Sequence, residues 1–149
     1  KTMSKPMEGT TPDPEIGFAI CIAKKFMGGT QNKWRKWLKG VVESEQFKAA
    51  AVKVVIIHVP PKSTGWHGEA EVARLFVPIL NSAGVDAMFC AHIHKYRFSE
   101  AGDPIYGCNF PVICNPNRTR MDVEVTKEKI TYAITNAEGK IITNEISIK

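Results

Sequence analysis

The 149-residue chain is predicted to be an α/β protein in which a parallel β-α-β unit precedes an antiparallel β-meander. Between residues 53 and 91, two short apolar runs flank a stretch with helical periodicity, and a strand–helix–strand connection within one sheet is right-handed and parallel. After residue 110, short segments of alternating apolar and polar residues follow one another. That alternation is typical of antiparallel strands with one buried face.

The first part of the chain predicts a loop, a strand and a helix. Residues 1–15 are rich in Pro, Thr and charge without periodicity, as in a loop or linker. Residues 18–23 (FAICIA) predict a buried strand, and Thr30 is a candidate N-cap for the helix after it. The apolar stripe of that helix has the spacing i, i+3, i+4, i+7: Trp34, Trp37, Leu38 and Val41. We therefore expect both tryptophans to belong to the core.

The β-α-β unit follows. Residues 53–59 (KVVIIHV) form a β-branched run that two prolines stop, which predicts a buried strand and then a loop over 62–68. Residues 85–91 (VDAMFCA) predict the next strand. The helix between them is expected to be kinked by Pro78 and closed by Gly84. Its apolar positions are Val72, Leu75, Phe76, Ile79 and Leu80.

Four short strands are expected in the remaining chain, and together they predict one meander with a buried face. They span residues 111–115, 119–126, 129–135 and 141–148. Tight turns are expected at Lys127-Glu128 and Glu138-Gly139.

Composition excludes several classes of protein. Hydrophobic residues make up 44% and charged residues 23% of the chain, ordinary values for a globular domain. No apolar run approaches the roughly 20 residues of a membrane span. The net charge of +5 is scattered, without a Lys/Arg block interleaved with aromatics, so no nucleic-acid partner is expected. The chain begins at Lys1 without an initiator Met or a signal peptide, which predicts that it is a piece of a longer polypeptide.

The four cysteines lack CxxC spacing and lie in or beside apolar runs: Cys21, Cys90, Cys108 and Cys114. Cys in such a setting is usually a small buried hydrophobe. A disulfide among them is the alternative that the sequence leaves open.

All four histidines fall within the β-α-β unit. His58, His92 and His94 lie at the carboxyl ends of predicted neighbouring parallel strands, the edge where open α/β sheets bind ligands. In a strand or tight turn, the side chains of His92 and His94 project to the same side. They would then reach one metal ion or two adjacent ones, with His58 beside them. Neutral imidazole is a good ligand for Zn, Fe and Mn. A single histidine at a strand end is more often structural, so the metal-site hypothesis depends on three of them lying together.

The residues around these histidines resemble the calcineurin-like metallophosphoesterase family, which includes the purple acid phosphatases. The family's late motifs are a strand-terminal His followed by Pro, and Gly-His-x-His with an aromatic residue two positions on. Here they are His58-Val59-Pro60 and Ala91-His92-Ile93-His94, followed by Tyr96. Ala91 stands where Gly is usual, a departure at a crowded turn. The resemblance spans roughly residues 30–149 and is specific between 54 and 98.

The resemblance implies a dinuclear centre of Fe, Zn or Mn that cleaves a phosphorylated small molecule or another phosphoester. His58 and His92 would bind one ion, and His94 the other. His67 resembles a substrate-pocket histidine that contacts phosphate or protonates the leaving alcohol. Its alternative is an exposed loop histidine.

The family's early motifs, Asp-x-His, Gly-Asp-x-x-Asp or -Tyr and Gly-Asn-His-Asp/Glu, do not occur in this chain. They carry the carboxylate and the Asn that hold two cations together, so the chain alone is expected to be inactive. Residues 16–149 are thus predicted to be the C-terminal half of an α/β sandwich domain whose missing half supplies one of its two sheets. Exposed apolar surface and open sheet edges would then favour homo-oligomers.

Two alternatives to the hydrolase remain. The first is a non-catalytic structural or interaction domain whose histidines are incidental. The second is a mononuclear histidine metal-binding module without phosphatase turnover.

Overall fold

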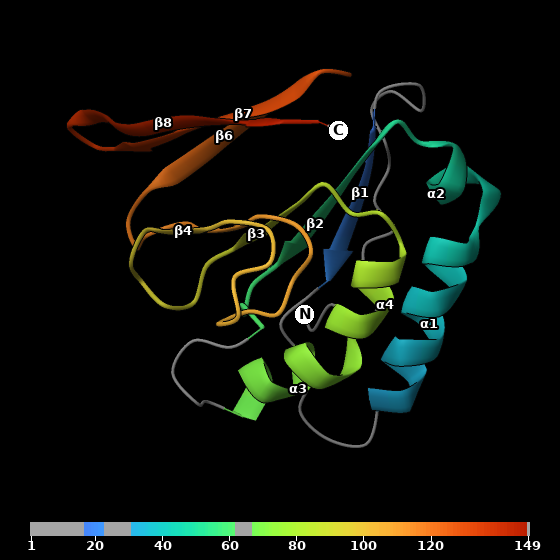
Figure 1. Cartoon of the computed structure of the whole chain (residues 1–149). Helices are drawn as coiled ribbons and strands as arrows, with labels where there is room; N and C mark the ends of the chain where they lie inside the picture. The colour runs from blue at the N-terminus through green and yellow to red at the C-terminus, as the bar shows by residue number, and fades with distance from the viewer. Residues whose placement is uncertain (1–16, 23–30, 62–66, 149) are drawn as a thin grey trace, which may run out of the picture.

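The computed structural model describes residues 17–22, 31–61 and 67–148 (Figure 1). The predicted loop at residues 1–15 lies outside these ranges. The elements, in chain order, are β1 (Gly17–Ile22), α1 (Gln31–Glu43), α2 (Glu45–Ala49), β2 (Val52–Ile57), α3 (His67–Leu75), α4 (Val77–Ser82), β3 (Ala87–Cys90), β4 (Arg97–Ser99), β5 (Val112–Cys114), β6 (Arg120–Val125), β7 (Lys129–Asn136) and β8 (Gly139–Ser147).

The first sheet has the strand order β1-β2-β3-β5-β4. Its first four strands are parallel, and β4 runs antiparallel to β5. The predicted β-α-β unit is therefore confirmed, since β2 pairs with β3 in parallel with Val54 opposite Ala87. Asp86 fixes the amino end of this pairing: its backbone N–H donates to the carbonyl of Lys53 (2.8 Å), and its carboxylate accepts from the Lys53 N–H (2.7 Å).

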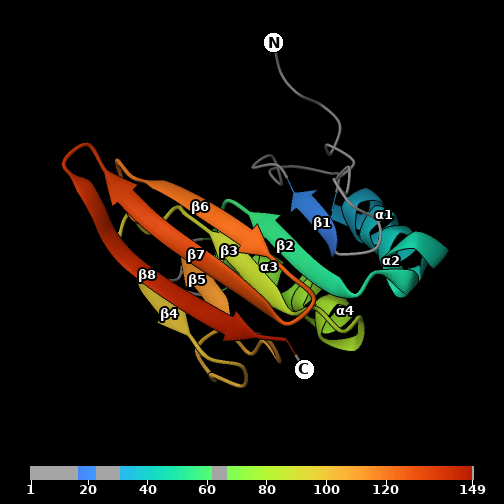
Figure 2. The ribbon, with the colours of Figure 1, turned by 90° about the horizontal axis from the view of Figure 1, so that it is seen from above.

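The first sheet lies between a layer of helices and a second, three-stranded sheet of order β6-β7-β8 (Figures 1 and 2). Successive residues of β2 point to opposite faces. Val55 packs among the helices with Leu38 and Leu80, whereas Val54 packs beneath the second sheet. Trp34 and Trp37 of α1 pack against the helix-side core, as predicted.

The interface between the two sheets is a second apolar core. Val52, Val54, Ala87, Phe89 and Ile113 of the first sheet meet Ile130, Tyr132, Ile134 and Ile146 of the second. The chain's own meander therefore provides the second packed layer, whereas the family resemblance predicts that a missing half provides one of the two sheets. At the carboxyl end of β2, Ile56 lies beyond the meander and is 45% exposed.

Tyr132 of β7 ties this interface to the segment that follows the predicted histidine motif. Its hydroxyl lies 2.9 Å from the hydroxyl of Tyr96, and the two share a hydrogen bond. Burial raises the pKa of Tyr132. Its hydroxyl therefore stays protonated at neutral pH.

Residues 111–115 correct the predicted four-stranded meander. The structure pairs β5 with β3 in parallel, so only β6, β7 and β8 form the meander. The three residues of β5 are all buried, and a strand covered on both faces lacks the alternation of a meander strand. The three-residue edge strand β4 was not predicted.

The structure also gives the positions of the two predicted turns and of the predicted helix kink. At the predicted Lys127-Glu128 turn, Thr126 N–H donates to the Lys129 carbonyl (2.9 Å). The other turn lies one residue before the predicted one, because Gly139 already begins β8 with a φ of 130°. The kink expected at Pro78 is a complete break between α3 and α4, with Pro78 in the first turn of α4, where its missing N–H costs nothing.

In the described part of the chain, every helix is too short or too polar to cross a membrane.

Replacing Ile134 with alanine should lower the free energy of unfolding by about 2–5 kcal/mol, since this side chain is fully buried between the sheets. Urea unfolding followed by circular dichroism measures the change. Ile141→Ala is the matched control, because Ile141 is 50% exposed, and it should change stability by less than about 0.5 kcal/mol. Equal effects of the two substitutions would contradict the packing of the meander on the first sheet.

Candidate functional site

Two of the predicted metal ligands meet at the carboxyl edge of the first sheet. His58 directly follows β2, and His92 follows β3 after one residue. The backbone holds the two segments together, since Ala91 N–H donates to the carbonyl of His58 (3.0 Å). The two imidazole rings lie 5.3 Å apart between centroids, with an interplanar angle of 74°. The structure thus brings His58 and His92 together at this edge, and their binding of a metal ion stays a prediction.

His92 and His94 lie in a tight turn, one of the two settings expected for them, with a left-handed backbone that the sequence does not predict. Both have positive φ angles, 62° and 59°, and Ile93 N–H donates to the carbonyl of Ala91 (2.7 Å). Left-handed backbone costs a residue with a Cβ about 1–2 kcal/mol. Such strain persists where surrounding structure enforces it, and it concentrates at functional sites.

Three contacts hold this turn in place. The side chain of Ile93 packs against the helix-side core. Behind the turn, Asn115 N–H donates to the carbonyl of Cys90 (2.8 Å) and Asn117 N–H to that of His94 (3.4 Å). The loop after β5 therefore belongs to the site's support, a role that sequence reasoning missed. Recognising β5 as a parallel strand would have placed this loop at the ligand-binding edge.

Two hydrogen bonds cross the loop after β5. The Thr119 hydroxyl donates to the Asn115 side-chain oxygen (2.9 Å), and the Asn115 amide donates to the Thr119 carbonyl (3.3 Å). The Asn115 side chain is thus engaged in ordering its own loop.

The geometry of the histidine pair fits a partial metal site. Imidazoles bound about 2.1 Å from one tetrahedral ion have ring centres about 5 Å apart, close to the 5.3 Å between His58 and His92. No group of three His, Cys, Asp or Glu side chains that could hold a metal ion exists among the described residues. A metal site built on this pair would need further ligands.

The other two predicted site residues are less defined. The side chain of His94 is exposed, and its assignment to a second ion stays a prediction. His67 is the first residue of α3 rather than part of a loop. Its side chain lies outside the described part of the structure, so its role also stays a prediction.

The thiols next to the histidine turn are buried and form no disulfide: Cys90, Cys108 and Cys114. Cys90 and Cys114 are register neighbours on β3 and β5. Burial raises the pKa of Cys90, and it raises the pKa of Cys108 to about 12. Because only a thiolate is a good nucleophile or metal ligand, these two thiols serve the core, as predicted. The side chain of Cys21 lies outside the described residues.

Comparisons with known proteins place the fold. No family model matches the chain, and no curated protein matches it in sequence. Among solved structures, it is similar to one described as "GAP50 the anchor in the inner membrane complex of Plasmodium", with a TM-score of 0.63 and 18% sequence identity. The match covers 89% of this chain and 50% of that one, so the chain spans about half the length of its structural neighbour. At this identity, the likeness shows the fold alone.

The left-handed backbone at His94 can be tested without any ligand. His94→Gly should be more stable than His94→Ala by about 1 kcal/mol, because glycine accepts a positive φ without strain. The measurement is urea unfolding of both variants. Lys95 is the matched control, because it is exposed and is not among the residues with positive φ. There, Lys95→Gly should be less stable than Lys95→Ala. The same order of stability of the Gly and Ala variants at both positions would contradict the strained turn.

Thiol reactivity tests the burial beside the site. At pH 8, a thiol with a pKa of about 12 is ionised in only about one molecule in ten thousand. Iodoacetamide should therefore leave Cys90 and Cys108 unmodified in the native chain. A hydrogen bond with Cys90 lowers the pKa of Cys114, but this thiol is fully buried and should stay unmodified because the reagent cannot reach it. All three should be modified in guanidinium chloride. Peptide mass spectrometry gives the extent at each site. Comparable labelling in both states would show that these thiols are accessible.

Proposed function

We propose that this chain is the C-terminal part of a metal-dependent phosphoester hydrolase with a metallophosphoesterase-like fold. In the complete site, His58 and His92 bind one metal ion and His94 binds a second. The approach of the His58 and His92 rings at the carboxyl edge of a parallel sheet carries the proposal. The strained turn at His92 and His94 adds support, because the chain keeps an unfavourable backbone where the ligands are proposed.

The remaining ligands are proposed to come from a preceding half of a longer protein. Carboxylates that could complete a three-ligand group with the histidines are lacking in the described segments. Next to His58, Ile56 exposes an aliphatic side chain on the face of the sheet that the meander leaves uncovered, and additional chain would pack there. The half-length match to a solved structure is compatible with this division.

Each of the proposed site residues has a specific part in the reaction. Ions such as Fe, Zn or Mn would bind phosphate oxygens and lower the pKa of a water molecule. His58 and His92 hold their position through the β2–β3 pairing, and the Asn115 loop supports the turn that carries His94. His67 would contact the phosphate or protonate the leaving alcohol. The substrate is a phosphorylated small molecule or another phosphoester.

A second candidate is a non-catalytic interaction domain. The observation that favours it is the description of the similar solved structure, which is called an anchor in a membrane complex. A mononuclear histidine module is the third. Metal binding and turnover separate the three.

Calorimetric titration of the chain with Zn²⁺ or Mn²⁺ should show weak binding that His58→Ala and His92→Ala abolish. His67→Ala is the control and should bind metal as the unaltered chain does, because its role is with the substrate. In a longer polypeptide that contains the chain, hydrolysis of p-nitrophenyl phosphate should fall at least about a hundredfold in His92→Ala, since a lost ion removes several kcal/mol of transition-state stabilisation.

Other outcomes identify the alternatives. Absence of metal binding in the longer polypeptide would leave the interaction domain. Tight binding by the chain without turnover in the longer polypeptide would indicate the mononuclear module.

A further inference from the structure

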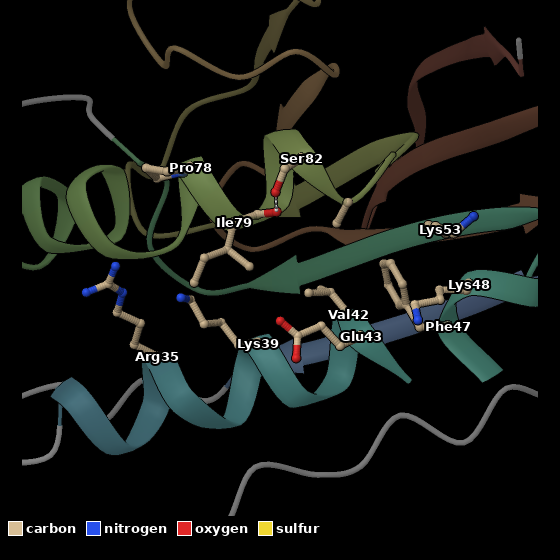
Figure 3. A pocket seen from close by; sticks show the side chains of 11 residues that line it. Arg35, Lys39, Val42, Glu43, Phe47, Lys48, Lys53, Pro78, Ile79 and Ser82 are labelled. Atoms are coloured by element: carbon tan, nitrogen blue, oxygen red, sulfur yellow. Dashed lines mark hydrogen bonds between the residues drawn. The ribbon is translucent and has the colours of Figure 1, made fainter. Parts of the chain in front are cut away.

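A groove on the helix layer is separate from the histidine pair. It has a volume of about 660 Å³ and lies among α1, α2, α4 and the amino end of β2 (Figure 3). Lys53 of β2 lines it, whereas His58 follows the other end of the same strand. The residues that line it and matter most for a ligand are Arg35, Lys39, Val42, Glu43, Phe47 and Ile79.

The inner part of the groove is apolar. Phe47 and Ile79 are buried, and Val42 and Ala83 are partly buried. Together they form a surface against which one inserted aliphatic or aromatic side chain would lose its contact with water.

The rim carries an ordered row of charges. Arg35, Lys39 and Glu43 follow one another at intervals of one helical turn along α1, and Figure 3 shows the first two extending toward α4. In the described part of the chain, no ion pair joins Arg35 or Lys39 to another residue. Both guanidinium and ammonium are therefore available to a ligand.

The two other cations of the groove are already engaged. Lys48 pairs with Glu45 (3.1 Å). The Lys53 ammonium donates to the carbonyl of Ala50 (2.8 Å) and lies 5.7 Å from the centre of the Phe47 ring. The charge that faces a ligand is thus concentrated on α1.

We propose that this groove binds an acidic amphipathic helix of a partner protein. Two carboxylates at positions i and i+4 of that helix pair with Arg35 and Lys39, and an apolar side chain at i+3, on the same face, enters the groove beside Phe47 and Ile79. The repeat of one turn is common to both helices, and helices commonly bind in grooves through side chains at this spacing. Glu43, one turn further along, selects a basic residue at the matching position.

The same row of charges disfavours other anionic partners. A flat anionic membrane would contact the rim but could not reach Phe47 in the groove. Glu43 would repel its headgroups, as it would repel a nucleic-acid backbone. A folded helix that alternates charge and apolar residues satisfies both the rim and the interior.

A synthetic fluorescein-labelled peptide tests the proposal. It carries Glu at positions i and i+4, Leu at i+3 on the same face and Lys at i+8, in an otherwise helix-forming sequence. Fluorescence anisotropy with the 149-residue chain should show binding that weakens as salt screens the charges. In a ¹⁵N–¹H spectrum, the shifted amides should lie in α1, α2 and α4.

Charge reversal supplies the decisive comparison. The double variant Arg35→Glu, Lys39→Glu should bind the peptide at least about tenfold more weakly, because attraction becomes repulsion. A peptide with Lys in place of both Glu residues should prefer the double variant to the unaltered chain. Lys127→Glu, Lys140→Glu changes the net charge equally at exposed positions of the meander and should leave binding unchanged.

Three results would overturn the proposal. The first is absence of peptide binding at low salt, and the second is an equal loss in both double variants. The third is binding of phosphatidylserine vesicles with the same dependence on Arg35 and Lys39, which would make the groove part of a membrane-binding surface instead.

Discussion

The parallel pairing of β2 with β3 determines where every other feature of the molecule lies. It is held at its amino end by Asp86, which bonds the backbone of Lys53 in both directions, and at its carboxyl end by the bond from Ala91 to His58. Between these points the helices cover one face of both strands. The meander covers the other face except at Ile56, which is 45% exposed. A shift of register by one residue would exchange the two faces of β2. It would also separate His58 from His92.

The organisation of the site follows from this arrangement. The sheet places the two rings next to each other, and the turn after β3 is then bent into a left-handed backbone at His92 and His94. Ile93 in the core and the Asn115 loop oppose the relaxation of that turn. The ordered scaffold thus offsets a local cost, as it does at many functional sites. The structure provides two converging imidazoles, and the metal site built on them stays a proposal.

The sequence was sufficient for the features that depend on local periodicity. The apolar stripe with Trp34 and Leu38 predicted α1, and the β-branched run at 53–59 predicted β2. It failed where tertiary context decides. The apolar triplet of β5 fits a meander strand or a doubly covered parallel strand, and only the sheet distinguishes them. For the site, sequence position predicted that His58 and His92 would meet, but the backbone of the turn after Ala91 has no periodic signature.

The hydrogen bond between Tyr96 and Tyr132 connects two parts of the chain that are distant in sequence. Tyr96 lies two residues after His94, and Tyr132 lies at the centre of the meander that covers the first sheet. Fraying of the C-terminal hairpin would break this link and remove one restraint on the segment next to the histidine turn, while Ile93 and the loop after β5 still hold the turn itself. A substitution in the meander should consequently be felt at the histidines as a small rise in local opening.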